Sequence, residues 1–334
     1  MTRVAPLGLS PLLPVDWRPV VPAGGGADTV WVANNTANTV TAIDIPSRSV
    51  LWTTPTLPGG LTNPLGITQG HLGLYVAGNH FGYMGLLDPA TGAVLEHGAP
   101  FSGTHTYVTP VVNNPGPSEN VLVTDNTAPG SVVLTASPFT NGLLFASGVG
   151  TDPYGAALRP KTREMWWSCV GTNEVQVMDL DTFGITHTIT VGNGPNGILF
   201  TDDGSTAYVV NNTDATVSVV DATTYTTTAT VGNWPAPVSA NDPNFAVFVD
   251  PSTLWVSFGA GNSFGVVDTT TNTATGGYAV GAVTDPIHMA TIGGMVWVTE
   301  KAANWVGVWD PATGTRVDAI ATGQGPQRLY VGTR

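Results

Sequence analysis

The chain has 334 residues, of which 42% are hydrophobic and only 10% are charged, and it contains 41 Gly and 26 Pro. This composition favours many short strands joined by tight turns over long surface helices. The net charge of −13 argues against a nucleic-acid groove or an anionic membrane surface, because both require clustered cations. No stretch approaches the roughly 18 apolar residues of a membrane span. Cys169 is the only cysteine, which excludes an intrachain disulfide and a multi-cysteine zinc site.

The first 28 residues lie outside any repeat and are rich in proline. Pro6, Pro11 and Pro14 interrupt what would be the apolar core of an export signal, so we predict that no signal peptide is present. Proline also stiffens the chain, and we expect residues 1–28 to form an extended arm. Five side chains of this arm are predicted to bind a partner: Leu9, Leu12, Leu13, Trp17 and Arg18.

Residues 29–334 contain three marks that recur at spacings typical of a propeller blade. A large residue in an apolar segment recurs at Trp31, Tyr75, Leu122, Trp166, Tyr208, Trp255 and Trp297. An acid follows at a fixed offset in every unit but the third, at Asp44, Asp88, Asp179, Asp221, Asp268 and Asp310. A proline precedes each large residue, at Pro64, Pro110, Pro153, Pro195, Pro243, Pro286 and Pro326.

Each unit has the pattern of four strands with alternating β-branched residues. The first unit lacks the proline strand that should precede Trp31, whereas the chain ends with such a strand, GQGPQRLYVG, and no apolar segment after it. The sequence therefore predicts an all-β, seven-bladed β-propeller over residues 29–334, in which residues 325–331 pair with residues 30–33 and close the first blade. Trp52, Trp234 and Trp305 are less bound by the repeat and could be surface contacts.

Residues 192–232 read GNGPNGILFTDDGSTAYVVNNTDATVSVVDATTYTTTATVG and resemble the YVTN family of β-propeller repeats. Weaker copies cover residues 29–334. The resemblance implies a fold more than a function, because similar propellers serve as surface-layer and adhesive modules, lactonases, streptogramin lyases and subunits of redox enzymes.

The residues that flank the prolines are the candidates for a ligand site, because ligands of propellers usually lie where the innermost strands meet the central channel. These channel-mouth candidates are Asn63, Asp152, Tyr154, Asn196, Asp242, Asn244, Asp285, His288 and Arg328. Their carboxylates and amides could bind Ca²⁺ or Mg²⁺ through oxygen. The alternative, which we favour, is that Asp and Asn beside proline form turns, and we expect neither a metal nor another cofactor.

The resemblance to streptogramin lyases implies His and Glu acting with Mg²⁺ near the channel mouth. Here His288 is the only histidine at its repeat position, and no Glu occupies an equivalent position, so that site is not recovered. Asp285 and His288 could still act as an acid/base pair. We therefore favour a protein that is not an enzyme, with a lactonase or lyase acting at the channel mouth as the alternative.

The extended arm, the repeat and the absence of an export signal together favour a non-enzymatic binding module. In this hypothesis the arm anchors the module in a larger assembly of protein subunits. A virion protein, for example a bacteriophage tail or capsid accessory protein, is made in the cytoplasm and works outside it without a signal peptide. In this hypothesis the propeller face binds a partner such as a cell-surface ligand, and neither nucleic acid nor a membrane span is involved. A cell-surface adhesion module is a second alternative.

Overall fold

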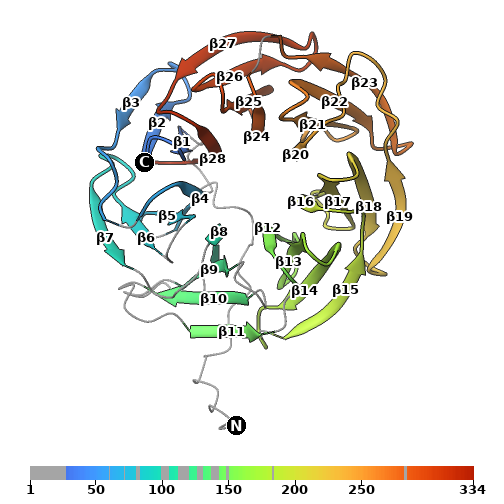
Figure 1. Ribbon diagram of the computed structural model, residues 1–334, viewed down its shortest axis with the longest axis horizontal. Helices are drawn as coiled ribbons and strands as arrows, with labels where there is room; N and C mark the ends of the chain where they lie inside the picture. Colours follow the sequence, from blue (N-terminus) through green and yellow to red (C-terminus); the bar gives the residue numbers. More distant parts are fainter. Residues whose placement is uncertain are drawn as a thin grey trace.

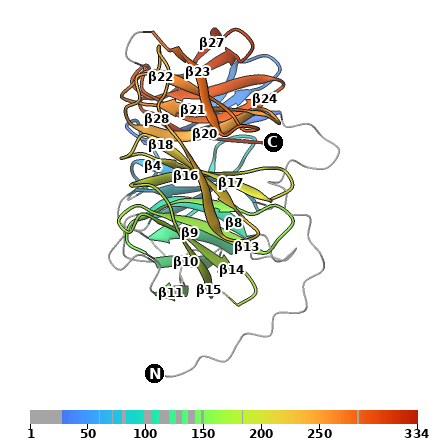
Figure 2. The same ribbon diagram turned by 90° about the vertical axis from the view of Figure 1, so that its right-hand side faces the viewer.

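The computed structural model describes residues 28–334 apart from 60, 71, 80–82, 99–104, 112–119, 126–130, 137–142, 148–149, 183 and 282–283, and it gives the backbone alone for the strands between 105 and 147. These residues form seven four-stranded antiparallel sheets, the blades, which surround a central axis (Figure 1). Figure 2 shows the ring from its side. Among the residues so described, no helix is long and apolar enough to cross a bilayer.

The strands of the first four blades follow the chain from the inside of the ring to its rim, except that β28 supplies the inner strand of blade 1. Blade 1 holds β1 (Thr29–Asn34), β2 (Thr39–Asp44) and β3 (Val50–Thr53); blade 2 holds β4 (Pro64–Gln69), β5 (Leu74–Gly78), β6 (Met84–Leu87) and β7 (Val94–Gly98); blade 3 holds β8 (His105–Val111), β9 (Asn120–Asp125), β10 (Ser131–Ala136) and β11 (Leu143–Ser147); blade 4 holds β12 (Pro153–Leu158), β13 (Glu164–Cys169), β14 (Glu174–Asp179) and β15 (Ile185–Thr190).

The last three blades repeat the same order and the chain then returns to blade 1. Blade 5 holds β16 (Pro195–Phe200), β17 (Thr206–Asn211), β18 (Thr216–Asp221) and β19 (Thr226–Val231); blade 6 holds β20 (Pro243–Asp250), β21 (Thr253–Phe258), β22 (Ser263–Asp268) and β23 (Thr273–Ala279); blade 7 holds β24 (Pro286–Ile292), β25 (Met295–Glu300), β26 (Trp305–Asp310) and β27 (Thr315–Ala321); β28 is Pro326–Gly332.

Burial follows the position of a strand within its blade. The second strand is packed between neighbouring blades, so that β1 and β5 are buried along their whole length. The outermost strand lies at the rim, and the threonines of β19 are exposed there. Thr keeps an edge strand extended while presenting a polar surface, which limits pairing with other chains.

The end of the chain closes the ring. Strand β28 pairs antiparallel with β1, with Val30 opposite Val331. Beyond β28, the Gln69 side-chain amide donates to the Thr333 carbonyl at 2.6 Å, and the Arg334 guanidinium lies 3.2 Å from the Asp44 carboxylate. The seven sheets and this closing strand are the arrangement that the repeat predicts.

Blade 3 departs from the predicted repeat. Pro64 and Pro153 each begin an inner strand and pair with the last residue of the second strand. In blade 3 that position belongs to His105, which begins β8 and pairs with Asp125, whereas Pro110 lies near the end of β8. The assignment of Pro110 to the repeated proline is therefore wrong. The predicted arm is also not tested, because residues 1–27 lie outside the described residues.

The three tryptophans interpreted as candidate surface contacts instead make contacts within the molecule. Trp52 covers Gly92, where an added Cβ would come within 2.7 Å of the indole. The Trp234 indole N–H donates to the Ala215 carbonyl at 2.7 Å, and that of Trp305 donates to the Glu300 carboxylate at 2.6 Å. Buried indoles usually find a hydrogen-bond acceptor, as those of Trp234 and Trp305 do, whereas the buried Nε1 atom of Trp52 has none.

Candidate functional site

One repeated backbone contact defines the end of the channel at which the inner strands begin. The residue before each inner strand accepts a hydrogen bond from the N–H of the residue that follows the second strand of the same blade. The six pairs within the described residues are Asn35 to Gly325, Asn79 to Asn63, Val170 to Asp152, Asn212 to Gly194, Gly259 to Asp242 and Lys301 to Asp285. We call the ring of these residues the channel mouth.

The four acids and amides before the inner-strand prolines adopt a left-handed backbone. Their φ angles are 50° at Asn63, 53° at Asp152, 60° at Asp242 and 53° at Asp285. Asn and Asp tolerate this conformation better than other side chains that carry a Cβ. The turn function expected of these residues is therefore present. It does not use the side-chain carboxylates, which remain available for another role at the mouth.

Two of these carboxylates converge in blade 6 because Gly259 leaves room for them. A Cβ placed on Gly259 would lie 2.6 Å from Oδ1 of Asp285 and 2.9 Å from both Oδ2 of Asp242 and Nδ2 of Asn244. Such distances are too short for real Cβ atoms, so any larger residue would displace the acids. Because Gly259 has no side chain, two carboxylates from neighbouring blades can lie close together beside it.

Three polar side chains surround the pair. The Asn212 amide donates to Oδ1 of Asp242 at 2.6 Å and to the Pro243 carbonyl at 2.9 Å. The Asn244 amide donates to the Asp242 carbonyl at 2.8 Å. The Lys301 ammonium lies 3.9 Å from Oδ2 of Asp285. Asp242 therefore receives a strong hydrogen bond, whereas Asp285 has a more distant cation.

Burial raises the pKa of Asp285 above the ordinary value of an aspartate, the Lys301 cation lowers it, and the negative charge of Asp242 raises it again. Two carboxylates in one site disfavour each other's ionisation, and this repulsion adds to the effect of burial on Asp285. The arrangement therefore places the Asp285 carboxyl group, whose pKa is raised, beside the Asp242 carboxylate. Such a pair can catalyse proton transfer to and from a bound substrate.

A second set of side chains from the inner strands, which we call the inner group, meets around Arg328. The Arg328 guanidinium lies 4.5 Å from the centre of the Phe245 ring and 5.4 Å from that of Tyr154. Arg328 comes from β28, Phe245 from β20 and Tyr154 from β12, so side chains of three blades meet around the axis. Arg328 is only 4% exposed, and cation–π contacts with the two rings hold it.

His288 belongs to this inner group. Its ring lies 4.5 Å from that of Phe245, and its Nδ1 atom is buried without a hydrogen-bond partner. Burial, together with the positive charge of Arg328, lowers the pKa of His288 to about 3. The histidine is thus neutral at physiological pH. Its contacts are with Phe245 and Arg328, and they give no support to the acid/base pair of Asp285 and His288 that the sequence left open.

The structure thus divides the nine predicted channel residues into three sets. Asp242, Asn244 and Asp285 form the carboxylate site, and Tyr154, His288 and Arg328 form the inner group. The third set contains Asn63, Asp152 and Asn196, which belong neither to the carboxylate site nor to the inner group. The predicted arm residues Leu9, Leu12, Leu13, Trp17 and Arg18 lie outside the described residues.

Sequence reasoning missed Asn212, Gly259, Lys301 and Phe245. The first three directly follow the second strand of their blades, and the pattern VWVANN already marks that position with a second Asn. Comparing this column across the units would have singled out Gly259 as the smallest residue and Lys301 as the cation. Among the residues that the structure describes, no three or more His, Cys, Asp or Glu side chains are grouped so that they could hold a metal ion.

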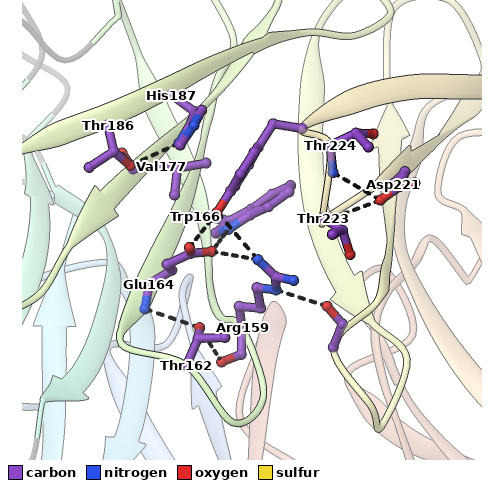
Figure 3. A network of polar contacts seen from close by, with 12 residues as sticks. Arg159, Thr162, Glu164, Trp166, Val177, Thr186, His187, Asp221, Thr223 and Thr224 are labelled. Carbon is purple, nitrogen blue, oxygen red and sulfur yellow. Dashed lines mark hydrogen bonds and ion pairs between the residues drawn. The ribbon is translucent and has the colours of Figure 1, made fainter.

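A separate polar network lies between blades 4 and 5, at the end of the propeller opposite the mouth (Figure 3). The Glu164 carboxylate accepts hydrogen bonds from Arg159 at 3.0 Å, from the Tyr225 hydroxyl at 2.6 Å and from the Trp166 indole at 3.3 Å. Tyr225 stacks on His187 with ring centres 3.6 Å apart. These side chains saturate one another and fill the space between the two blades, which indicates a structural role.

Comparison with known proteins gives the fold and no family. No protein-family model matches the chain, and no curated protein matches it, so the resemblance to YVTN repeats is not confirmed. A protein of unknown function from Desulfotomaculum acetoxidans superposes with a TM-score of 0.72 at 14% identity, covering 92% of this chain and 99% of that one.

Two solved enzymes have a similar structure. The periplasmic gluconolactonase of Pseudomonas aeruginosa gives a TM-score of 0.69 at 17% identity, covering 91% of this chain and 98% of that one. Virginiamycin B lyase from Staphylococcus aureus gives 0.62 at 17% identity, covering 82% and 94%. The chain is therefore a β-propeller similar to those of lactonases and streptogramin-type lyases. At these identities the likeness concerns the fold alone.

Proposed function

We propose that this protein is a propeller enzyme that opens a lactone or a similar cyclic ester at the channel mouth, with Asp242 and Asp285 as its proton-transfer pair. The convergence of the two carboxylates on Gly259 carries the proposal, because a glycine there has a cost in chain entropy and no turn requires it. The similar folds of a gluconolactonase and a virginiamycin B lyase support this class of chemistry over a purely structural role.

In the proposed reaction, the Asp242 carboxylate takes a proton from a water molecule, and the water oxygen adds to the lactone carbonyl carbon. The ring carbon–oxygen bond then breaks, and protonated Asp285 gives its proton to the departing ring oxygen. The product is an open hydroxy acid, and proton transfer from Asp242 to Asp285 restores the starting state. The hydrogen bond from Asn212 orients the Asp242 carboxylate, while burial and the charge of Asp242 raise the pKa of Asp285 and so favour its role as the proton donor.

The direct test is hydrolysis of a panel of five- and six-membered sugar and aliphatic lactones and one cyclic depsipeptide. Loss of the proton donor in Asp285→Asn should lower the rate by a factor of about 100 or more. Asp152→Asn is the matched control, because Asp152 has the same backbone conformation and the same place in blade 4 but lies outside the carboxylate site. Gly259→Ala should also remove activity, since its Cβ displaces both acids.

Equal activity of the wild type and Asp285→Asn, or no activity of the wild type on any member of the panel, would overturn the proposal. The predicted anchored, non-enzymatic module remains a separate hypothesis, because its arm residues lie outside the described residues. A protein that starts at Ala27 tests it. That protein should fold and fail to join its parent assembly if the arm is an anchor, whereas an enzyme of the kind proposed here should keep its activity.

A further inference from the structure

The end of the propeller opposite the mouth carries two grooves of the same design. The first has a volume of about 350 Å³ and lies between blades 5 and 6; its polar lining includes Ser205, Thr206, Asp221, Thr223, Thr228 and Asn272. The second has a volume of about 320 Å³ and lies on blade 6; its lining includes Ser252, Thr253, Asp268, Thr270 and Thr275. Antiparallel pairing of Thr206 with Asp221 and of Thr253 with Asp268 places both grooves at this end.

The two grooves present the same residue types at equivalent positions of successive blades. Thr206 and Thr253 begin the second strand of their blades, and Asp221 and Asp268 end the third. The groove in blade 5 therefore recurs one blade further along the ring. Its ligand groups recur with it, so that a ligand with a repeating structure could occupy both.

The equivalent space between blades 4 and 5 is filled (Figure 3). There Glu164 occupies the position of Thr206 and its carboxylate binds Arg159 and the Tyr225 hydroxyl. Tyr225 occupies the position that Asn272 has in the next blade. Replacing an aromatic ring and a carboxylate by Asn and Thr is thus what opens the groove between blades 5 and 6. The chain itself contains the filled version of the site.

The groove linings offer hydroxyl groups and carboxylates, and they include the apolar side chains of Val219, Val266 and Val267. In both Asp221 and Asp268, Oδ1 accepts the hydrogen bonds of the turn. The second carboxylate oxygen, Oδ2, takes no part in these turn bonds. Asn272 adds a side-chain amide, with its Oδ1 3.4 Å from the Tyr208 hydroxyl. Short polar side chains that both donate and accept match the hydroxyls of a sugar.

The negative charge of the protein restricts which sugars the grooves can bind. With 23 acidic and 10 basic residues and an aspartate in each groove, the protein repels sulfated or carboxylated chains. We propose that each of the two grooves binds its own neutral oligosaccharide, and that a neutral polysaccharide, which reaches both grooves, is bound bivalently. Bivalent binding gains from the high effective concentration of the second site once the first is occupied. The grooves lie at the end opposite the carboxylate site, so this proposal does not depend on the enzymatic one.

Isothermal titration calorimetry of the whole protein with neutral hexasaccharides of glucose, mannose, galactose and N-acetylglucosamine tests the proposal. At least one of these probes should bind with two sites per chain. The double variant Thr206→Glu with Asn272→Tyr copies the filling seen at Glu164 and Tyr225 and should reduce two sites to one. Its affinity for the corresponding polysaccharide should fall about tenfold or more, because bivalent binding is lost.

Asp152→Asn, at the opposite end, should keep two sites and serves as the control. If the double variant melts well below the wild type, the single variant Asn272→Tyr replaces it in the titration. Its ring fills the groove without adding a charge, so it should also reduce two sites to one. The proposal is overturned if none of the four hexasaccharides binds. It is equally overturned if the filled variants keep both sites.

Discussion

The hydroxyl of Ser257 accepts a hydrogen bond from the backbone N–H of Phe245 at 3.2 Å and donates one to the Ile287 carbonyl at 2.6 Å. One buried side chain thereby joins the inner strands of blades 6 and 7, which carry Asp242 and Asp285 at their starts. Ser168 joins blades 4 and 5 and Thr299 joins blades 7 and 1 in the same way. The relative position of the two carboxylates therefore depends on this hydroxyl.

Ser257→Ala should destabilise the fold by about 1–3 kcal/mol, because it leaves a buried N–H and a buried carbonyl without their partner. Ser257→Thr should lose less, since Thr299 makes the same contacts in blade 7. Urea unfolding monitored by tryptophan fluorescence measures both. Equal stability of the wild type and the alanine variant would show that the hydroxyl does not join the blades.

A second prediction concerns a missing asparagine. Asn38, Asn173, Asn262 and Asn304 have φ angles near 50° to 60°, and each accepts a backbone N–H at the entrance of the following blade. Blade 5 has Ala215 at this position with φ of 53°. Ala215→Asn should therefore stabilise the protein by about 0.5–1 kcal/mol, because Asn tolerates the left-handed region.

The matched control for that substitution is Asn173→Ala, which should destabilise the protein, since it introduces the strain and removes the bond to Gly194. Thermal melts of the three proteins under one condition give the order of stability. A melting temperature of Ala215→Asn below that of the wild type would contradict this account of the turn.

Stability should fall in acid because many turn aspartates accept hydrogen bonds in the folded state. The pKa is below its ordinary value at Asp44, Asp88, Asp203, Asp214, Asp221, Asp250 and Asp268. For Asp203, bonds from Thr201 and Ser205 lower the pKa from 3.8 to about 2. A lowered pKa in the folded state stabilises it above the ordinary value, and this contribution is lost as the pH falls through the folded value.

Asp203→Asn should therefore be less stable than the wild type at about pH 6, and the difference should shrink as the pH approaches about 2. Because Asp203 is exposed, the difference at pH 6 should be small. Urea titrations at several pH values measure it. A difference that stays constant over this range would show that the carboxylate charge does not contribute.

The closing strand gives a fourth prediction. Deleting residues 325–334 removes β28, exposes the edge of β1 and abolishes the contacts of Thr333 and Arg334. We expect a large cooperative loss of stability or aggregation, because an unpaired strand edge is a site for pairing with other chains. Arg334→Ala is the milder comparison and should have little effect, as its ion pairs are partly exposed. A truncated protein that melts like the wild type would contradict closure by β28.

The sequence reveals the blades of this fold because each blade repeats the same local chemistry. The large residue in the second strand, the acid at the end of the third and the proline that begins the first occupy equivalent positions, as Trp166, Asp179 and Pro153 do in blade 4. Blade 3 shows the limit of this reasoning. A proline within a few residues of the expected place, Pro110, matched the spacing although His105 begins the strand.

The site could be predicted only in part, because it depends on contacts between blades. The proline-flanking rule identified Asp242 and Asp285, but 43 positions along the chain separate them, and nothing in either unit alone shows that they meet. Gly259 lacks a side chain, so its importance is visible only from what a Cβ would displace. Asp152 follows the same rule and joins no such pair, which shows that the rule identifies a location and not a function.

The central claim is that Asp242 and Asp285 act as one proton-transfer pair, and the pH dependence of kcat/KM for lactone hydrolysis tests it most directly. Activity should fall as the pH rises through the pKa of Asp285, since the proton donor is then lost. Lys301→Met removes the cation that lowers this pKa, so the alkaline limb should move to higher pH. A limb that stays in place in Lys301→Met would contradict the account, as would full activity in Asp285→Asn.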